Sequence, residues 1–332
     1  MRTNAVTIGA VTLALAAVAA GGVGGLNGYT ADVYYANPHA GESLVSFDWA
    51  GGDLYYGTGI PNYGLGFKVY SYDGAGSSAV HSDAGVFAGS RVTEIDGQVY
   101  FNDGGDYGRT TFDYFRHDPS GGPVVRIIDS IADSVDLWGL NSRNGQDFWA
   151  VGSSSSAISQ SDLDANGDPV GLTAIGQAGG YSGPMAFDGD GNLYYANSYS
   201  TEPRIYRWTA AEVDAAVADP AGSPLESTGH VWADIAGPQT GATGMAVGED
   251  GDVYVTVTAF ASPSELRRYF VDETGANDGV VIAATSDARL ETVRAREGLI
   301  YFSAADGIYS VPEPATLGLL AIGAFAAIRK MK

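Results

Sequence analysis

A short pattern of apolar and aromatic residues recurs along the middle of the chain. Each copy reads glycine, a variable residue, a branched apolar residue, an aromatic residue and a further apolar or aromatic residue. The regular copies are residues 52–56, 97–101, 191–195, 251–255 and 298–302, and residues 145–150 form a degenerate copy. Successive aromatic residues, at positions 55, 100, 149, 194, 254 and 301, are 45, 49, 45, 60 and 47 residues apart. A period in the forties is typical of β-propeller blades.

Further apolar segments surround the copies and predict four short strands per unit. Segments such as 44–47 and 244–247 precede the copies and predict inner strands, whereas segments such as 69–72 and 205–208 follow them and predict third strands. In most units turn residues then lead to a fourth apolar segment, as at 280–283. The pattern therefore predicts an all-β protein with a six-bladed β-propeller over residues 29–311.

The two ends of this repeat region predict how the ring closes. The last unit stops after Tyr309 and lacks a fourth strand, whereas residues 32–36 offer a spare one. Pairing residues 33–36 with the strand that contains Ile308 and Tyr309 would remove an exposed sheet edge. The longest step between copies is explained by an insertion, because residues 209–218 favour a helix that stops at residues 220–222.

Two copies with their preceding turns, residues 187–194 and 247–254, resemble blades of NHL-type and gluconolactonase-like propellers. In both segments an apolar residue is followed by an acidic, glycine-containing turn and then by the recurring aromatic residue, Tyr194 or Tyr254. The resemblance implies the propeller fold. It does not imply an activity, because one fold hosts many unrelated functions.

The N-terminus has the features of a secretory signal peptide. One basic residue, Arg2, precedes an apolar run at residues 5–20, and Ala17-Val18-Ala19 provides the small-x-small pattern that a signal peptidase needs. The run is short for a membrane span. Residues 1–28 are therefore predicted to be a signal helix and linker, detached from the propeller and processed by signal peptidase.

The C-terminus combines three features in a fixed order. These are the motif Pro312-Glu313-Pro314, an apolar run at residues 315–328 and a basic cluster of Arg329, Lys330 and Lys332. A helix over the apolar run would span about 21 Å, less than the roughly 30 Å hydrocarbon core, so it suits transient membrane association better than permanent anchoring. Because proline cannot continue a helix, we expect the motif to present an extended recognition peptide. An ordinary single-pass anchor is the alternative.

With this arrangement, residues 312–332 resemble the PEP-CTERM sorting signal of Gram-negative bacteria. The resemblance implies a hydrophobic sorting helix, processing by an exosortase, and export to the cell surface or the extracellular space. Proteins with this signal are often associated with extracellular polysaccharide or biofilm. The resemblance covers only the end of the chain and says nothing about what the propeller does.

Composition excludes several classes of function. The chain has 332 residues and a net charge of -22, and a surface of that sign repels nucleic acids and anionic lipids. It has no cysteine, so disulfides, thiolate zinc sites, iron–sulfur clusters and cysteine nucleophiles are excluded. The 47 glycines and 20 tyrosines fit many short strands joined by tight turns.

One acidic segment raises calcium as a cofactor. Oxygen ligands occur at alternate positions, as at the start of an EF-hand loop, on Asp162, Asp164, Asn166 and Asp168. The twelfth position is Thr173 instead of the bidentate glutamate of that loop. The same segment suits a hairpin turn between third and fourth strands, because Asn-Gly is a preferred turn pair. Both interpretations stay open.

Other candidate chemistry is sparse. The four histidines, at positions 39, 81, 117 and 230, have no spacing that places two metal ligands on one helix face, although a propeller channel can gather ligands from distant blades. Residues 153–156 are serines without a nucleophile elbow. The recurring aromatic residues are expected to pack between adjacent sheets. Better candidates for ligand binding fall in irregular loops, namely Tyr63, Tyr107, Tyr181 and Tyr199.

Two hypotheses for function follow. The first is an exported, non-enzymatic propeller that binds polysaccharide or another extracellular ligand at the cell surface or in the matrix. The alternative is a secreted propeller enzyme, a lactonase-like hydrolase or a polysaccharide lyase, with a metal in the central channel. An enzyme requires carboxylate, His or Asn groups converging at one mouth of the channel, whereas a binding module requires aromatic and hydrogen-bonding groups on a shallow face. The lack of a complete catalytic signature favours the first.

Overall fold

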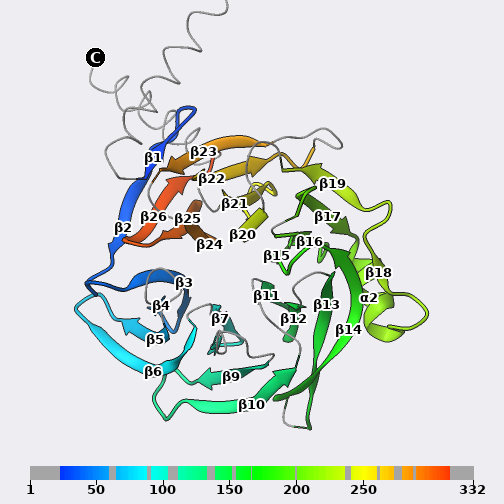
Figure 1. Cartoon of the computed structure of the whole chain (residues 1–332), viewed down its shortest axis with the longest axis horizontal. Helices are drawn as coiled ribbons and strands as arrows, with labels where there is room; N and C mark the ends of the chain where they lie inside the picture. Colours follow the sequence, from blue (N-terminus) through cyan, green and yellow to red (C-terminus); the bar gives the residue numbers. More distant parts are fainter. Residues whose placement is uncertain are drawn as a thin grey trace, which may run out of the picture.

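The strands of the protein form a ring of sheets around a central axis (Figure 1). A computed structural model describes residues 23–59, 65–87, 91–103, 111–132, 139–151, 155–165, 167–198, 200–235, 241–259, 262–272, 279–286 and 289–314. The described strands form six sheets, which are the blades of a propeller. The predicted all-β, six-bladed β-propeller is therefore confirmed. The two predicted targeting helices, at residues 5–20 and 315–328, lie outside the described residues.

Each blade begins with an inner strand near the axis and adds strands outward in chain order (Figure 1). Blades 1 and 2 contain β3 (Ser43–Ala50), β4 (Asp53–Gly59), β5 (Leu65–Tyr72) and β6 (Ser77–Phe87), then β7 (Val92–Ile95), β8 (Gln98–Asn102), β9 (Thr111–His117) and β10 (Val125–Ala132). Blades 3 and 4 contain β11 (Gly139–Arg143), β12 (Gln146–Val151), β13 (Ser155–Leu163) and β14 (Pro169–Gly179), then β15 (Met185–Phe187), β16 (Leu193–Ala196), β17 (Arg204–Trp208) and β19 (Val231–Asp234). Blades 5 and 6 contain β20 (Gly241–Val247), β21 (Val253–Ala259), β22 (Ser262–Tyr269), β23 (Val280–Thr285) and β1 (Gly24–Gly25), then β24 (Leu290–Arg296), β25 (Leu299–Ala304), β26 (Gly307–Pro312) and β2 (Asp32–Ala36).

Blade 6 is closed by a strand from the other end of the sequence. β24, β25 and β26 supply three strands, and β2 adds the fourth, on the outside. Val33 pairs with Tyr309 and Tyr35 pairs with Ile308, as predicted. This pairing covers the edge of β26 and joins the first and last parts of the ring.

The predicted insertion in blade 4 is a helix. α2 (Ala210–Ala218) begins with a capping box, in which the Thr209 side chain accepts a hydrogen bond from the Glu212 backbone and the Glu212 side chain accepts one from the Thr209 backbone. A short strand after it, β18 (Leu225–Glu226), pairs in parallel with the outer edge of β14. The insertion therefore covers part of the edge of the neighbouring blade 3. No described helix is long and apolar enough to cross a membrane.

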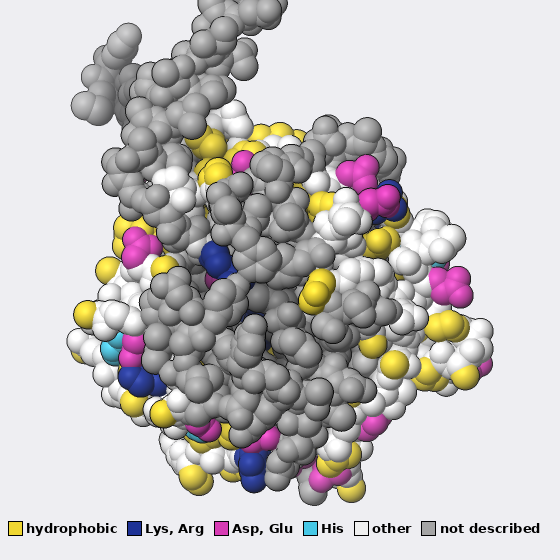
Figure 2. Space-filling model, viewed as in Figure 1, with side chains coloured by type: hydrophobic (Ala, Val, Ile, Leu, Met, Phe, Trp, Pro, Cys, Tyr) yellow, Lys and Arg dark blue, Asp and Glu magenta, His cyan; other side chains and the backbone are white. Residues whose placement is uncertain are grey.

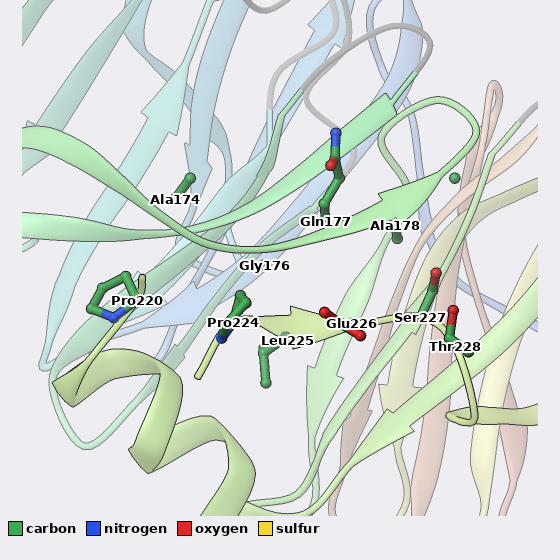
Figure 3. Close-up of a pocket in the computed structure, with 11 residues that line it drawn as sticks. Ala174, Gly176, Gln177, Ala178, Pro220, Pro224, Leu225, Glu226, Ser227 and Thr228 are labelled. Atoms are coloured by element: carbon green, nitrogen blue, oxygen red, sulfur yellow. The ribbon is translucent and has the colours of Figure 1, made fainter. Parts of the chain in front are cut away.

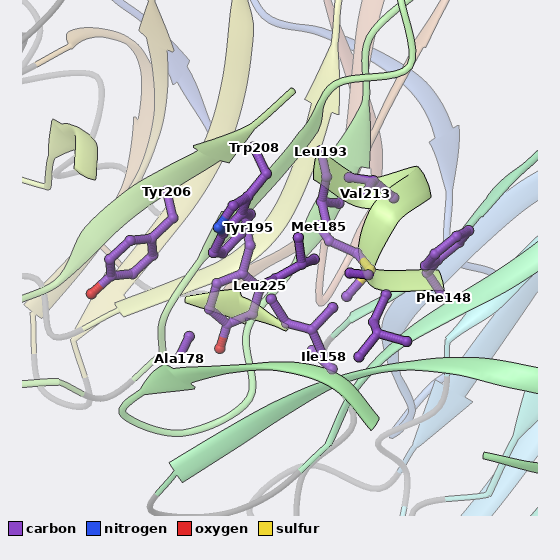
Figure 4. Packing of buried hydrophobic residues seen from close by; sticks show 13 residues of the cluster. Phe148, Ile158, Ala178, Met185, Leu193, Tyr195, Tyr206, Trp208, Val213 and Leu225 are labelled. Atoms are coloured by element: carbon purple, nitrogen blue, oxygen red, sulfur yellow. The ribbon is translucent and has the colours of Figure 1, made fainter. Parts of the chain in front are cut away.

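Hydrophobic residues fill the interfaces between neighbouring blades. Between blades 3 and 4, for example, Phe148, Tyr195 and Trp208 pack with Val213 of α2 (Figure 4). The recurring aromatic residues all lie on second strands in these interfaces and are at most 8% exposed; they are Tyr55, Tyr100, Trp149, Tyr194, Tyr254 and Tyr301. Burying such a ring contributes about 3 kcal/mol, so the repeat seen in the sequence is the repeat of the core.

The turns between first and second strands lie together at one end of the blades. In blade 6 the turn has two residues, Glu297 and Gly298, with φ of 55° and 70°. Such turns match the right-handed twist of a hairpin. Blades 4 and 5 have longer turns, at residues 188–192 and 248–252, in which the first N–H donates to the carbonyl of the fifth residue.

Candidate functional site

The inner strands of the propeller approach one another closely at the axis. A methyl group at Gly244 of β20 would lie 1.9 Å from the carbonyl oxygen of Glu291 in blade 6. A methyl group at Gly139 of β11 would likewise lie 2.5 Å from the Gly183 carbonyl oxygen, just before β15. These positions require glycine because no Cβ fits at such distances. The inner strands of adjacent blades are therefore in close contact at this level.

Arg91 crosses the centre of the ring. It precedes β7 in blade 2 and is 5% exposed. Its guanidinium donates a hydrogen bond to the Thr292 hydroxyl of blade 6, at 2.8 Å, and another to the Thr243 carbonyl of blade 5. Burial lowers the pKa of Arg91 to about 10, so the side chain is still charged at neutral pH.

The carboxylates beside Arg91 are paired with further arginines. The Arg289 guanidinium lies 3.1 Å from Glu291, whose pKa is raised by burial. The Arg294 guanidinium lies 2.9 Å from Asp48 of blade 1. Among the residues that the structure describes, no three His, Asp or Glu side chains are placed to hold a metal ion. The described part of the channel is therefore a network of arginines that joins the blades.

The predicted calcium segment lies in the hairpin between β13 and β14. The Asp164 carboxylate accepts a hydrogen bond from the Asp168 backbone at 3.0 Å, and the Gly167 backbone donates to the Asp164 carbonyl. The Asp168 carboxylate forms an ion pair with Arg116 of blade 2. The Asp162 carboxylate accepts from the Thr173 hydroxyl at 2.7 Å. Asn166 is outside the described residues, so calcium binding stays a prediction.

The four histidines lie in different parts of the ring. His39 precedes β3 and stacks on Tyr70, His81 is on β6 among phenylalanines, and His117 ends β9. His230 precedes β19 and contacts Glu212 of α2 at 3.0 Å. Burial lowers the pKa of His81 and of His117. His81 and His117 both border the interface between blades 1 and 2, where His81 contacts Phe115 and His117 contacts Tyr55.

A groove lies on the outside of blade 3, between β14 and the insertion (Figure 3). Its volume is about 720 Å³, and its walls include Gln177 of β14 and Leu225 and Glu226 of β18. Ser227 and Thr228 provide hydroxyls at one end. Glu226 is the one ionisable side chain among its lining residues, so the groove has no acid–base pair for catalysis.

An aromatic cluster lies at the seam between blades 6 and 1. We call it the seam platform and define it by Tyr34 of β2, Trp49 of β3, Arg296 of β24 and Tyr301 of β25. The Tyr301 ring centroid lies 4.9 Å from that of Tyr34 and 4.8 Å from that of Trp49. The Arg296 guanidinium lies 5.1 Å from the Trp49 ring centroid. Tyr34 is 48% exposed and the Arg296 side chain is 40% exposed, so the platform reaches the surface.

Sequence reasoning did not identify the seam platform. Tyr301 is a recurring core residue and Tyr34 was expected in the closing strand, but their meeting with Trp49 depends on how blade 6 sits beside blade 1. Of the loop tyrosines proposed from the sequence, Tyr181 is 38% exposed. The other three, Tyr63, Tyr107 and Tyr199, are outside the described residues.

The sorting motif is in a different place from the one expected. Pro312 is the last residue of β26, and Glu313 is only 1% exposed. The motif is extended at Pro312, as expected, but the Glu313 side chain is buried by the propeller and is not presented. Pro314 is partly exposed, and the basic residues Arg329, Lys330 and Lys332 lie outside the described residues.

The fold and the C-terminal motif together define a six-bladed propeller with a sorting signal. Residues 310–332 match the PEP-CTERM protein-sorting motif. The chain is therefore an exported protein of the kind that an exosortase processes. No curated protein matches the chain.

Solved structures similar to this chain are propellers with low sequence identity. An aldose sugar dehydrogenase from Streptomyces coelicolor is 13% identical, with a TM-score of 0.55 over 88% of this chain and 98% of that one. Virginiamycin B lyase from Staphylococcus aureus is 12% identical, with a TM-score of 0.53 over 86% and 99%. A gluconolactonase from Xanthomonas campestris is 14% identical, with a TM-score of 0.53 over 88% and 92%. At these identities the likeness concerns the fold alone.

Proposed function

We propose that this exported propeller is a non-enzymatic module that binds polysaccharide at the cell surface or in the extracellular matrix. The observation that carries the proposal is the seam platform. Aromatic rings offer flat apolar faces on which the C–H faces of sugars stack. In the platform the exposed ring is that of Tyr34, which meets Trp49 and Tyr301 edge-on, and the Arg296 guanidinium over the Trp49 ring supplies hydrogen-bond donors for sugar hydroxyls.

The negative charge of the protein favours a neutral polysaccharide over an acidic one. Acidic side chains are spread around the face of the ring seen in Figure 2, and the chain carries a net charge of -22. A polymer of uronic acids would be repelled by such a surface, whereas a neutral polysaccharide would not. Next to the platform, Glu297 is 74% exposed and pairs with Arg296 at 3.1 Å. A carboxylate at that place can accept hydrogen bonds from sugar hydroxyls.

The channel supports the binding hypothesis over the enzyme with a channel metal. Arg91 lies where the inner strands converge, and its positive charge repels a metal cation. The nearby carboxylates of Glu291 and Asp48 are already paired with arginines. A metal bound there would have to displace these contacts.

The test is binding of the purified protein to polysaccharides of different charge. We expect it to sediment with an insoluble neutral glucan and not with alginate. The Tyr34→Ala variant should bind about fivefold to tenfold more weakly, since an aromatic contact contributes about 1 kcal/mol. Tyr181→Ala, which removes an exposed tyrosine from another blade, should bind like the wild type.

Two outcomes would overturn the proposal. One is equal binding by the wild type and Tyr34→Ala, which would place the ligand elsewhere. The other is hydrolysis of a sugar δ-lactone, or release of unsaturated uronates from a polysaccharide, by the wild-type protein. Either reaction would support the enzyme alternative, and substitution of Arg91 would then show whether the channel carries it.

A further inference from the structure

The glutamate of the sorting motif is part of the propeller. Glu313 follows β26, and its backbone N–H donates to the Gly298 carbonyl at 2.9 Å. This bond extends the antiparallel pairing of β25 and β26, in which Leu299 is opposite Pro312. The Glu313 side chain is 1% exposed. The central side chain of the motif is therefore buried just before the predicted sorting helix begins.

The Glu313 carboxylate is bound by a turn of the neighbouring blade. The backbone N–H groups of Glu249 and Asp250 donate to its two oxygens, Oε1 and Oε2, at 3.2 and 3.3 Å. These residues belong to the turn between β20 and β21 in blade 5. In the opposite direction, the Gly298 backbone N–H donates to the Glu249 carboxylate at 3.3 Å. Glu313 thus fastens the end of blade 6 to blade 5.

The equivalent turn of blade 4 shows what Glu313 replaces. There the first residue is Asp188, and its own Oδ1 accepts from the backbone N–H groups of Asp190 and Asn192, at 3.0 and 2.9 Å. In blade 5 the first residue is Gly248, which has no side chain. In blade 5 the Glu313 carboxylate of blade 6 binds the N–H of the third residue, Asp250, as Asp188 does in blade 4, and also that of the second residue, Glu249. The N–H of the fifth residue, Asp252, donates to Asp250 Oδ1 instead.

Gly248 also leaves the space that Glu313 needs. A methyl group at this position would lie 3.2 Å from Glu313 Oε1, 2.6 Å from Asp250 Oδ1 and 2.8 Å from the Tyr254 ring. The turn therefore fits the glutamate of the motif in both shape and hydrogen bonding. Burial and the nearby Asp250 and Glu249 raise the pKa of Glu313, whereas the hydrogen bonds from the backbone of Glu249 and Asp250 lower it.

We propose that the folded propeller sequesters its own sorting motif, so that the exosortase can engage Pro312-Glu313-Pro314 only after Glu313 has left the turn of blade 5. A peptide whose central side chain is buried and whose backbone is paired in a sheet cannot enter the cleft of another enzyme. Sorting then competes with closure of the last blade. A chain that folds fully before it meets the enzyme is processed slowly.

The experiment changes the turn of blade 5 and leaves the motif intact. The Gly251 N–H donates to the Gly248 carbonyl, so Glu249 is the second residue of a β-turn, where proline is favoured. Glu249→Pro keeps the turn but removes one donor to Glu313, together with the carboxylate that accepts from the Gly298 N–H. In Gly248→Ala the methyl group would crowd Asp250 Oδ1 and the Tyr254 ring most closely and Glu313 Oε1 less, so the turn that binds the carboxylate must shift. Gly189→Pro, at the same position of the blade 4 turn, is the matched control.

Conversion of the full-length precursor is followed by pulse-chase in an exosortase-bearing host. Loss of one hydrogen bond to a carboxylate makes the released state about tenfold more populated, so Glu249→Pro and Gly248→Ala should be processed several-fold faster than the wild type. The Gly189→Pro control should match the wild type. Hydrogen exchange of purified precursors should show faster exchange at residues 309–314 in the first two variants only.

A second comparison separates release of the motif from general unfolding. Gly183→Ala strains blade 4, because its methyl group would lie 1.7 Å from the Ala196 carbonyl oxygen, far from Glu313 in the ring. At an equal loss of melting temperature, Gly183→Ala should be processed more slowly than Gly248→Ala. Equal rates of processing for these two variants would overturn the proposal. It would also be overturned by a variant in which hydrogen exchange at residues 309–314 is faster but processing is as slow as in the wild type.

Discussion

The Nη1 atom of Arg91 lies 2.8 Å from the Thr292 hydroxyl, although the two residues belong to blades 2 and 6, which are not neighbours in the ring. The same guanidinium reaches the Thr243 carbonyl of blade 5. One side chain therefore joins three blades across the axis, where small residues and close strand approach leave little room for other contacts.

Replacing Arg91 should destabilise the ring as a whole. Arg91→Met leaves the Thr292 hydroxyl and the Thr243 carbonyl without their donor and removes a positive charge near Glu291, which we expect to cost about 2–3 kcal/mol of unfolding free energy. Arg91→Lys should recover only part of it, because an ammonium group cannot reproduce the planar set of donors. Urea denaturation measures the change. Arg126→Ala, which breaks an exposed pair with Asp113, is the control and should change the stability by less than about 0.5 kcal/mol.

Closure of the ring can be tested at Tyr35. This residue of β2 is 9% exposed, and its hydroxyl lies 2.8 Å from both the Tyr56 hydroxyl and the Ser77 hydroxyl of blade 1. Tyr35→Ala should cost about 3–5 kcal/mol and Tyr35→Phe about 1 kcal/mol. Val33, on the same strand, is 60% exposed, so Val33→Ala should be nearly neutral. If Tyr35→Ala unfolds at the wild-type urea concentration, β2 does not close the ring in solution.

A buried carboxyl makes stability depend on pH in a defined direction. Asp147 of β12 is 3% exposed and accepts a hydrogen bond from the Tyr114 hydroxyl at 3.0 Å. Burial raises the pKa of Asp147 to about 6, from 3.8. Between about pH 4 and 6 the folded state thus keeps a proton that the unfolded state has released. The contribution of Asp147 to the free energy of unfolding therefore falls as the pH rises through this range.

Asp147→Asn isolates that contribution. The difference in unfolding free energy between wild type and variant should shift by about 3 kcal/mol in favour of the variant between pH 3.5 and pH 7, since each pKa unit corresponds to about 1.4 kcal/mol. Melting curves of both proteins across this range give the difference directly. Parallel curves would mean that Asp147 titrates normally. The same melting curves of Asp73→Asn, which changes an exposed carboxyl group, are the comparison.

The sequence predicted those parts of the molecule that depend on local pattern. The spacing of Tyr55, Tyr100 and the later aromatic residues predicted six blades, and the missing fourth strand predicted that residues 33–36 pair with the strand that contains Tyr309. Contacts between distant residues could not be predicted. Arg91 reaches residues 152 and 201 positions away. The burial of Glu313 could not be predicted either. Nothing in the sequence around the motif indicates that a turn of blade 5 binds its carboxylate.

The remaining question from the sequence is whether the β13–β14 hairpin binds calcium. Two of the carboxylates have other partners: Asp168 pairs with Arg116, and Asp162 accepts from Thr173. They therefore do not point to one calcium site. We therefore expect calcium to raise the melting temperature no more than magnesium does at equal ionic strength, because both only screen the charge of -22. Asp164→Ala should cost no more than about 1 kcal/mol, the typical contribution of one turn hydrogen bond. A ligand that binds only the folded state would behave differently, since its stabilisation grows with the logarithm of its concentration. A calcium-specific rise in melting temperature that disappears in Asp164→Ala would show that the segment is a binding loop.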